Sequence, residues 1–195
     1  GRVVIPKEIR RTLRIKEGDP LEIFTDRDEL MLKKYSPIGE LNTFAREYVE
    51  ALVQEIAYTG ELARQLGLRL ETVYFGGGTP TTLTAEQLAR LLAAVEQSFD
   101  LSTVREYTVE AGRPDTVTPE KLQAIRAAGV SRISINPQTL QDSVLQTIGR
   151  RHTVEQFYNA FDMARRAGCD HINTDLIAGL PGDTVAGFDD TLAGI

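Results

Sequence analysis

Polar or glycine-rich residues follow each of four short apolar runs in the second part of the chain. In chain order these groups are Gly76-Gly77-Gly78-Thr79-Pro80, Glu110-Ala111-Gly112-Arg113-Pro114, Asn136-Pro137-Gln138 and Gly179-Leu180-Pro181-Gly182. The last run itself contains Asn173 and Asp175. A triple glycine lets the backbone approach a ligand and presents N–H donors to it, although alone it also fits a tight turn. Carboxylates and amides suit the hydroxyl or ammonium groups of a ligand. The recurrence favours a ligand site, and the lack of a lysine after the glycines excludes a Walker loop.

The four apolar runs alternate with stretches of helical periodicity. Thr84 with Gln87 forms a capping box, and Pro119 suits the first turn of a helix. The alternation predicts parallel strands joined by helical crossovers, in an open sheet or a barrel. In either fold, ligands bind at the carboxyl ends of the strands. We expect strands over 70–75, 104–109, 130–135 and 171–177, and helices over 40–67, 85–99, 119–128 and 154–167.

The first 35 residues follow a different, β-α-β-β pattern. Residues 2–5 read as a strand, 7–13 as a short helix, and 21–25 with 30–35 as a hairpin. Residues 1–16 carry six basic side chains and one acidic one, whereas residues 36–195 have a net charge of −8. A basic beginning on an acidic remainder suits a polyanionic partner, and the plain alternative is a solvated helix face.

Composition excludes several classes of protein. The chain has 195 residues, of which 42% are hydrophobic, and its net charge of −6 is typical of a globular protein rather than a disordered one. No run approaches the roughly 18 apolar residues of a membrane span, so we expect no membrane partner. The single cysteine, Cys169, cannot form an internal disulfide, so we expect a protein of the reducing cytoplasm. Cys169 also cannot form a cysteine-ligated metal site by itself, and we expect it to fill the core.

Four ordered motifs carry a family resemblance over residues 45–195. YFGGGTPTTL, TVEAGRPDT, GVSRISINPQTLQDSVLQTIGRRHT and NTDLIAGLPGDT resemble the radical S-adenosylmethionine (SAM) enzymes of the oxygen-independent coproporphyrinogen dehydrogenase group, and the HemZ-like branch fits best. The resemblance implies a partial (β/α)6 barrel, SAM as cofactor and a porphyrinogen as substrate in heme biosynthesis.

The same resemblance implies a set of SAM-binding residues. The GGGTP loop would meet the methionyl amino group, a strand-end glutamate and a later glutamine would contact the cofactor, and an arginine and an aspartate on the fifth strand would complete the pocket. The matching residues are Gly76, Gly77, Gly78, Thr79, Glu110, Gln138, Arg150 (with Arg151 as an alternative) and Asp175.

One family motif is missing from the chain. The family carries C-x-x-x-C-x-x-C after its first strand, and these thiolates hold a [4Fe–4S] cluster that delivers the electron for SAM cleavage. This chain has one cysteine, and the basic β-α-β-β segment stands where that strand and loop belong. We therefore expect no metal ligands and no catalytic residues, and only weak SAM binding.

The N-terminal segment resembles a second family. GRVVIPKEIRRTLRIKEGDPLEIF, followed by LKKYSPIGEL, is similar to the swapped-hairpin DNA-binding domain of the AbrB and SpoVT transition-state regulators, over residues 1–42. The resemblance implies an intertwined homodimer that contacts DNA through residues 1–16, with Arg2, Arg10 and Arg11 at the matching positions. Guanidinium groups pair with phosphates and guanine edges, which agrees with this role.

Three functions stay open on the sequence. The chain is a radical SAM enzyme, a DNA-binding regulator, or a truncated chimera of residues 1–42 and 43–195 with both activities damaged. We favour the inactive chimera, because the cluster cysteines are absent and the chain begins at Gly1 and stops at Ile195 within an expected helix. The alternative is a genuine regulator in which a barrel fragment binds a ligand.

Overall fold

The computed structural model describes residues 10–11, 21–26, 29–34 and 37–195, and it divides the chain into two compact units, 1–48 and 49–195. The expected strand over 2–5 and most of the expected helix over 7–13 lie outside the described residues. Arg10 and Arg11 are helical and exposed, and Arg2 is not described.

The first unit contains the expected hairpin. Strand β1 (Leu21–Asp26) pairs antiparallel with β2 (Glu29–Lys34), in a register that sets Leu21 opposite Lys34 and Asp26 opposite Glu29. Helix α2 (Pro37–Gln65) follows, three residues longer at its start than the periodicity predicts.

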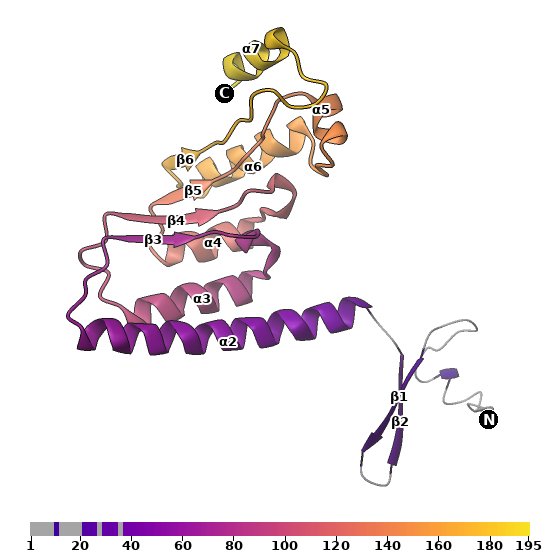
Figure 1. Ribbon diagram of the computed structural model, residues 1–195, viewed down its shortest axis with the longest axis vertical. Helices are drawn as coiled ribbons and strands as arrows, with labels where there is room; N and C mark the ends of the chain where they lie inside the picture. The colour runs from indigo at the N-terminus through magenta and orange to yellow at the C-terminus, as the bar shows by residue number, and fades with distance from the viewer. Residues whose placement is uncertain (1–9, 12–20, 27–28, 35–36) are drawn as a thin grey trace. The chain divides into compact units, whose positions relative to one another are not determined.

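A four-stranded, fully parallel sheet forms the centre of the second unit (Figure 1). Its strand order is the order in the chain, which confirms the expected helical crossovers and the α/β fold class. The strands are β3 (Thr72–Phe75), β4 (Glu106–Glu110), β5 (Arg132–Ser134) and β6 (His171–Asn173). The helices are α3 (Ala85–Ser98), α4 (Pro119–Ala127), α5 (Asp142–Thr147), α6 (Val154–Arg166) and α7 (Val185–Ala193), with 3-10 turns η1 (Pro80–Thr82) and η2 (Pro114–Thr116).

Local capping explains where the crossover helices begin. The side chains of Thr84 and Thr153 each accept a hydrogen bond from the backbone N–H three residues on. The side chains of Gln87 and Gln156 in turn accept from the backbone N–H of the capping threonine, so both form complete capping boxes. The prediction of these two helix starts is confirmed. Thr118 caps α4 in the same way without a partner glutamine.

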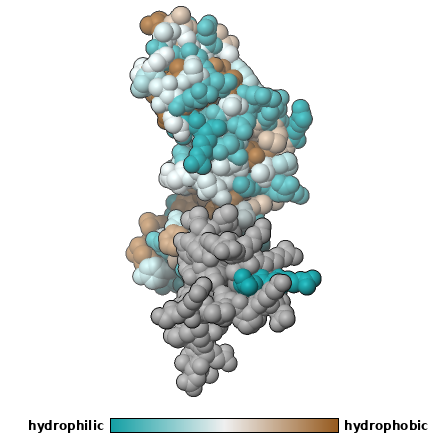
Figure 2. All heavy atoms as spheres, turned by 90° about the vertical axis from the view of Figure 1, so that its right-hand side faces the viewer, coloured by the Kyte–Doolittle hydropathy of each residue, from teal (hydrophilic) through white to brown (hydrophobic). Residues whose placement is uncertain are grey.

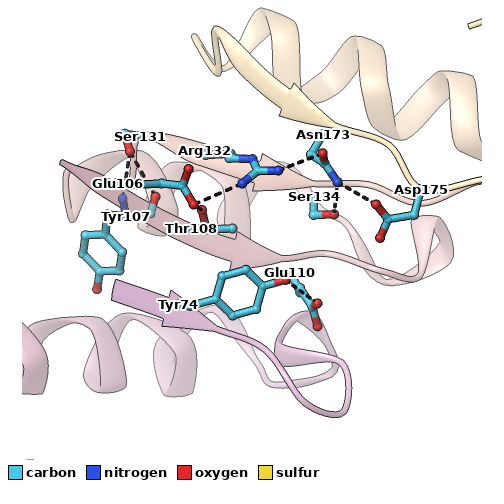
Figure 3. Close-up of polar contacts among 10 residues, drawn as sticks. All are labelled: Tyr74, Glu106, Tyr107, Thr108, Glu110, Ser131, Arg132, Ser134, Asn173 and Asp175. Carbon is cyan, nitrogen blue, oxygen red and sulfur yellow. Dashed lines mark hydrogen bonds and ion pairs between the residues drawn. The ribbon is translucent and has the colours of Figure 1, made fainter. Parts of the chain in front are cut away.

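The sheet has two chemically different faces. Alternate residues such as Val109 and Ile133 are buried in a core formed with α3, α4 and α6. The residues between them, including Glu106, Thr108 and Arg132, line the opposite face (Figure 3). Cys169 is 5% exposed in the same core, as expected, and burial raises the pKa of its thiol.

The strands are shorter than the apolar runs that predict them. β6 ends at Asn173, so the expectation that Asp175 lies on a strand is wrong. The cause is visible in the backbone, because the N–H of Asp175 donates to the side-chain Oδ1 of Asn136 at 3.0 Å instead of to a backbone carbonyl. Pairing resumes as one isolated bridge between Gln138 and Leu176.

In the described part of the chain, no helix is long and apolar enough to cross a bilayer.

Candidate functional site at the carboxyl edge of the parallel sheet

A polar network crosses the face of the sheet that the helices leave uncovered (Figure 3). Glu106 accepts hydrogen bonds from Thr108 Oγ1 at 2.9 Å and from Arg132 Nη1 at 3.0 Å. Thr108, and then Arg132, hold the pKa of Glu106 below its usual value. Arg132 Nη2 also donates to Asn173 Oδ1 at 2.8 Å. Through Arg132, the network joins β4 to β5 and β6 at the middle of the sheet.

Two asparagines hold the carboxylate of Asp175 at the carboxyl end of this network. Asn136 Nδ2 donates to Oδ2 at 2.9 Å, and Asn173 Nδ2 donates to Oδ1 at 2.8 Å. Ser134 Oγ in turn donates to Asn136 Oδ1 at 2.9 Å. Neutral amides therefore fix the direction of the acidic group without neutralising its charge.

Glu110 ends β4 at the same edge of the sheet (Figure 3). Its Oε1 accepts a hydrogen bond of 2.5 Å from the Tyr74 hydroxyl. This bond, followed by partial burial and the charges of Glu110 and Asp175, raises the pKa of Tyr74 to about 12. The carboxylates of Glu110 and Asp175 lie on the same face of the sheet (Figure 3).

The glycine loop leaves β3 beside Glu110. A Cβ at Gly76 would lie 3.2 Å from Glu110 Cδ, and Gly77 has a φ of +100°, which L side chains rarely adopt. The loop ends in η1, where Thr79 O accepts from Thr82 N at 2.8 Å. Gly76, the first residue of the expected loop, therefore lies next to the expected glutamate.

A partly buried lysine, Lys121, connects this loop to the one that follows Glu110. Lys121 Nζ donates to Thr81 O at 2.6 Å and to Thr116 O at 2.9 Å, and the hydroxyls of these threonines are 2.6 Å apart. Thr81 belongs to η1 and Thr116 to η2. The tie fixes the spacing between the glycine loop and the end of β4, and partial burial lowers the pKa of Lys121.

Gln138 has the one positive φ among the described residues other than glycine, +67°. Its side chain is 6% exposed, its backbone N–H donates to Asp175 O at 3.2 Å, and its carbonyl accepts from Ile177 N at 2.9 Å. Such backbone strain is held only where the surrounding structure determines it, and it often occurs at ligand sites. Gln138 therefore lies beside Asp175, as a shared site requires.

Arg150 lies after α5 and is partly buried, whereas Arg151 is exposed. The following residue, His152, is 3% exposed, and its Nε2 is 3.3 Å from Pro137 O. This contact brings the connection 150–152 next to the chain that leads into Gln138. Within the described residues, we find no side-chain contact that joins Arg150 itself to Glu110 or Asp175.

The burial of His152 predicts a pH-dependent stability. Burial, and then the charges of Arg150 and Arg113, lower its folded-state pKa below the ordinary 6.5, against opposing effects of Pro137 O and Asp115. Above pH 6.5 the ring is neutral in both states and contributes nothing. Below pH 6.5, His152 is protonated in the unfolded chain but stays neutral in the folded chain. The unfolding free energy therefore falls by up to about 1.4 kcal/mol per pH unit until the folded pKa is reached.

Urea unfolding between about pH 5 and pH 7 measures this slope. His152→Gln is expected to flatten this slope, because an amide takes up no proton in this pH range. The amide can still donate to Pro137 O, so the fold should be retained. The exposed His171 offers the control His171→Gln, which keeps the wild-type slope. Equal slopes in wild type and His152→Gln would contradict the assignment.

The described residues do not fit an iron–sulfur cluster. Among them, no group of three His, Cys, Asp or Glu side chains is placed to hold a metal ion. The whole sequence has one cysteine, Cys169, and it lies in the core away from the polar face. A three-thiolate cluster site therefore cannot form from this chain's own residues.

Comparison with known proteins assigns the fold. The family model described as the radical SAM superfamily matches residues 34–194. The chain belongs to the radical SAM superfamily. Residues 1–40 match a second model, described as antidote-toxin recognition MazE, bacterial antitoxin. The superfamily implies SAM and a [4Fe–4S] cluster as cofactors.

Relatives in sequence support both family resemblances, that of the radical SAM part and that of the N-terminal segment. The chain is 44% identical over 147 residues to the oxygen-independent coproporphyrinogen-III oxidase-like protein HemZ of Bacillus subtilis, and 41% identical over 143 residues to the heme chaperone HemW of the same organism. These matches cover 75% and 71% of this chain but 29% and 36% of those proteins. Stage V sporulation protein T of Bacillus subtilis is 70% identical over 60 residues, or 30% of this chain and 34% of that protein. The chain thus spans about a third of the length of these relatives.

A solved structure confirms the fold class. Coproporphyrinogen III oxidase HemN from Escherichia coli, described as a radical SAM enzyme, superposes with a TM-score of 0.68 and 31% identity. The match covers 77% of this chain and 34% of that one. The parallel sheet is therefore a fragment of a radical SAM barrel.

Proposed function

We propose that residues 43–195 provide the SAM-binding edge of a barrel of the oxygen-independent coproporphyrinogen oxidase type. The observation that carries the proposal is the meeting of Glu110, Asp175 and the glycine loop at one carboxyl edge, on one open face (Figure 3). SAM carries a sulfonium and an ammonium charge. Within the described residues, the carboxylates of Glu110 and Asp175 have no ion-pair partner, so they suit a cationic ligand.

Each group has a proposed task in holding the ligand. The loop from Gly76 to Thr79 takes the methionyl amino group, and Glu110 with Gln138 takes the ribose hydroxyls. Asp175 adds negative charge at the same edge, and Arg150, or alternatively Arg151, pairs with the ligand carboxylate. Viewed from the carboxyl ends of the strands, the surface of this unit is mainly hydrophilic, which fits a polar ligand (Figure 2).

No radical step is assigned to these 195 residues. A bound cluster would supply the electron that cleaves SAM, but the chain's one cysteine cannot hold it. A porphyrinogen is the substrate class that we propose for the parent enzyme, since HemZ and HemN are named for coproporphyrinogen oxidation. HemW, named a heme chaperone, is almost as similar, and its name also refers to a tetrapyrrole.

The proposed SAM affinity is low. Without a metal to chelate the methionine end, hydrogen bonds of about 0.5–1.5 kcal/mol each must offset the ordering of a flexible ligand. We expect a Kd near a millimolar, or about −4 kcal/mol. Calorimetric titration of the full chain with SAM tests this, and heat that does not saturate would overturn the proposal.

We propose a second function, DNA binding, for residues 1–42. Two observations favour it, the exposed helical Arg10 and Arg11 and the 70% identity to the sporulation protein. A homodimer formed by this segment would double the basic surface. Binding through phosphates is salt-dependent and largely independent of base sequence.

Replacing both arginines tests the second function. Arg10→Ala with Arg11→Ala should weaken duplex binding and lower the salt slope by about two, because two phosphate contacts are lost. Fluorescence anisotropy with a labelled duplex at several salt concentrations measures both. A double alanine variant at Arg64 and Arg69, which belong to the other unit, is the control. Binding that depends neither on salt nor on the Arg10–Arg11 pair would refute the assignment.

A further inference from the structure

Tyr74 is an exposed aromatic residue with a fixed position on the open face of the sheet. Its side chain is 58% exposed, yet its hydroxyl makes the 2.5 Å hydrogen bond to Glu110 Oε1. The register pairs Tyr74 with Thr108, so Glu110 is its diagonal neighbour on the same face. Long side chains reach each other across this diagonal.

The glycine at position 76 provides the space for this contact. A Cβ there would collide with Cε1 of the Tyr74 ring and would lie 2.9 Å from Cδ1. The ring therefore lies against the backbone of the first glycine of the loop. The Tyr74 side chain is thus fixed by its place on β3, by packing against the Gly76 backbone and by its hydrogen bond to the Glu110 carboxylate.

This geometry leaves one oxygen of Glu110 open. Oε1 is occupied by the phenol, and in the described part of the chain Oε2 has no hydrogen-bond donor. A carboxylate held by one oxygen loses less rotamer freedom when a ligand binds the other. Since the pKa of Tyr74 is raised to about 12, the phenol keeps its proton at neutral pH and remains a donor.

We propose that Tyr74 is a positioning residue of the candidate site, which holds Glu110 so that Oε2 faces a ligand at the glycine loop. The proposal rests on the proposed SAM-binding function and adds to it Tyr74, the first residue of the YFGGGTPTTL motif, to which the family resemblance assigns no role. Two alternatives contradict this proposal. In the first, the Tyr74 ring takes no part in ligand binding. In the second, the ring covers the site and the ligand must displace it.

The test compares Tyr74→Phe with wild type by NMR titration with SAM. Phenylalanine keeps the ring against Gly76 and removes only the hydroxyl, so the fold is retained. The initial slope of the chemical-shift titration, which is inversely proportional to Kd for weak ligands, should fall about five- to tenfold. Tyr58→Phe, at an exposed tyrosine of α2, is the matched control and should not change the slope.

A double variant separates positioning from a general structural effect. In a Glu110→Gln background, Tyr74→Phe should cause no further loss, because its effect acts through the carboxylate. An absorbance titration gives a reading without ligand. Tyr74 is identified as the tyrosine whose ionisation is missing from the titration of Tyr74→Phe. Its pKa should be about 12 in wild type and closer to the ordinary 10 in Glu110→Gln.

The outcomes distinguish the two claims. If wild type binds no SAM, the proposed function fails and the ligand role of Tyr74 fails with it. If wild type binds and Tyr74→Phe binds equally well, only the role of Tyr74 is overturned. Tighter binding by Tyr74→Phe would identify a lid, and an equal loss in the Glu110→Gln background would identify a structural effect.

Discussion

Glu110→Gln is expected to weaken SAM binding beyond the range of calorimetry while leaving a measurable NMR titration slope. The change keeps the size of the side chain, and the amide oxygen still accepts from Tyr74, so the local packing survives. It removes the negative charge that faces the ligand, and a hydrogen bond to a charged group contributes about 1.5–3 kcal/mol. Starting from a millimolar Kd, this loss places binding beyond measurement by calorimetry.

The matched control for this prediction is Glu71→Gln. Glu71 precedes β3 at the opposite, amino end of the sheet, and it lies 4.0 Å from Arg105 as an exposed ion pair. Both variants change the net charge by the same amount. Equal weakening by both would show that SAM responds to overall charge, and an unchanged affinity in Glu110→Gln would remove Glu110 from the site.

Anaerobic reconstitution of the 195-residue chain with iron and sulfide is expected to give no stable cluster. A [4Fe–4S] centre of this superfamily needs three thiolates close together, and the chain offers one thiol. Burial of Cys169 raises its pKa, which makes even this thiol a poor ligand. Without a cluster, dithionite should yield no 5′-deoxyadenosine from SAM.

Visible absorption and iron content after desalting measure this result. Cys169→Ser serves as the control, because any residual iron bound non-specifically is the same in both proteins. A stable charge-transfer band that is lost in Cys169→Ser would contradict the prediction, and about one iron per chain would then indicate a cluster shared between copies.

Local sequence signals predicted the helices better than the strands. The Thr84 and Thr153 capping boxes act within one turn, so the starts of α3 and α6 were readable. Strand ends depend on neighbouring chains, and the side chain of Asn136 interrupts the ladder at Asp175. Nothing local signals that contact. The six-residue helix α5 also went unpredicted, since so short a segment has little periodicity.

The candidate site was likewise predictable only where the signal is local in the sequence. Glu110, Gln138 and the glycine loop were found because they follow apolar runs, and the structure places them at one edge. Tyr74 and Arg132 had no assigned role, and the bonds from Asn136 and Asn173 to Asp175 were not predicted, since only the pairing of β3 to β6 aligns these residues. Their positions on alternate strand residues were the available signal. Arg150 came from the resemblance alone, and its place in a site stays a prediction.

Chemical-shift mapping of SAM on isotope-labelled full-length chain tests the central claim most directly. The account predicts saturable shifts at the loop from Gly76 to Thr79 and at Glu110, Gln138 and Asp175. It predicts none on the outer faces of α4 and α6. Shifts gathered on those outer helices, or no saturation well above millimolar SAM, would contradict a ligand site at the carboxyl edge of the sheet.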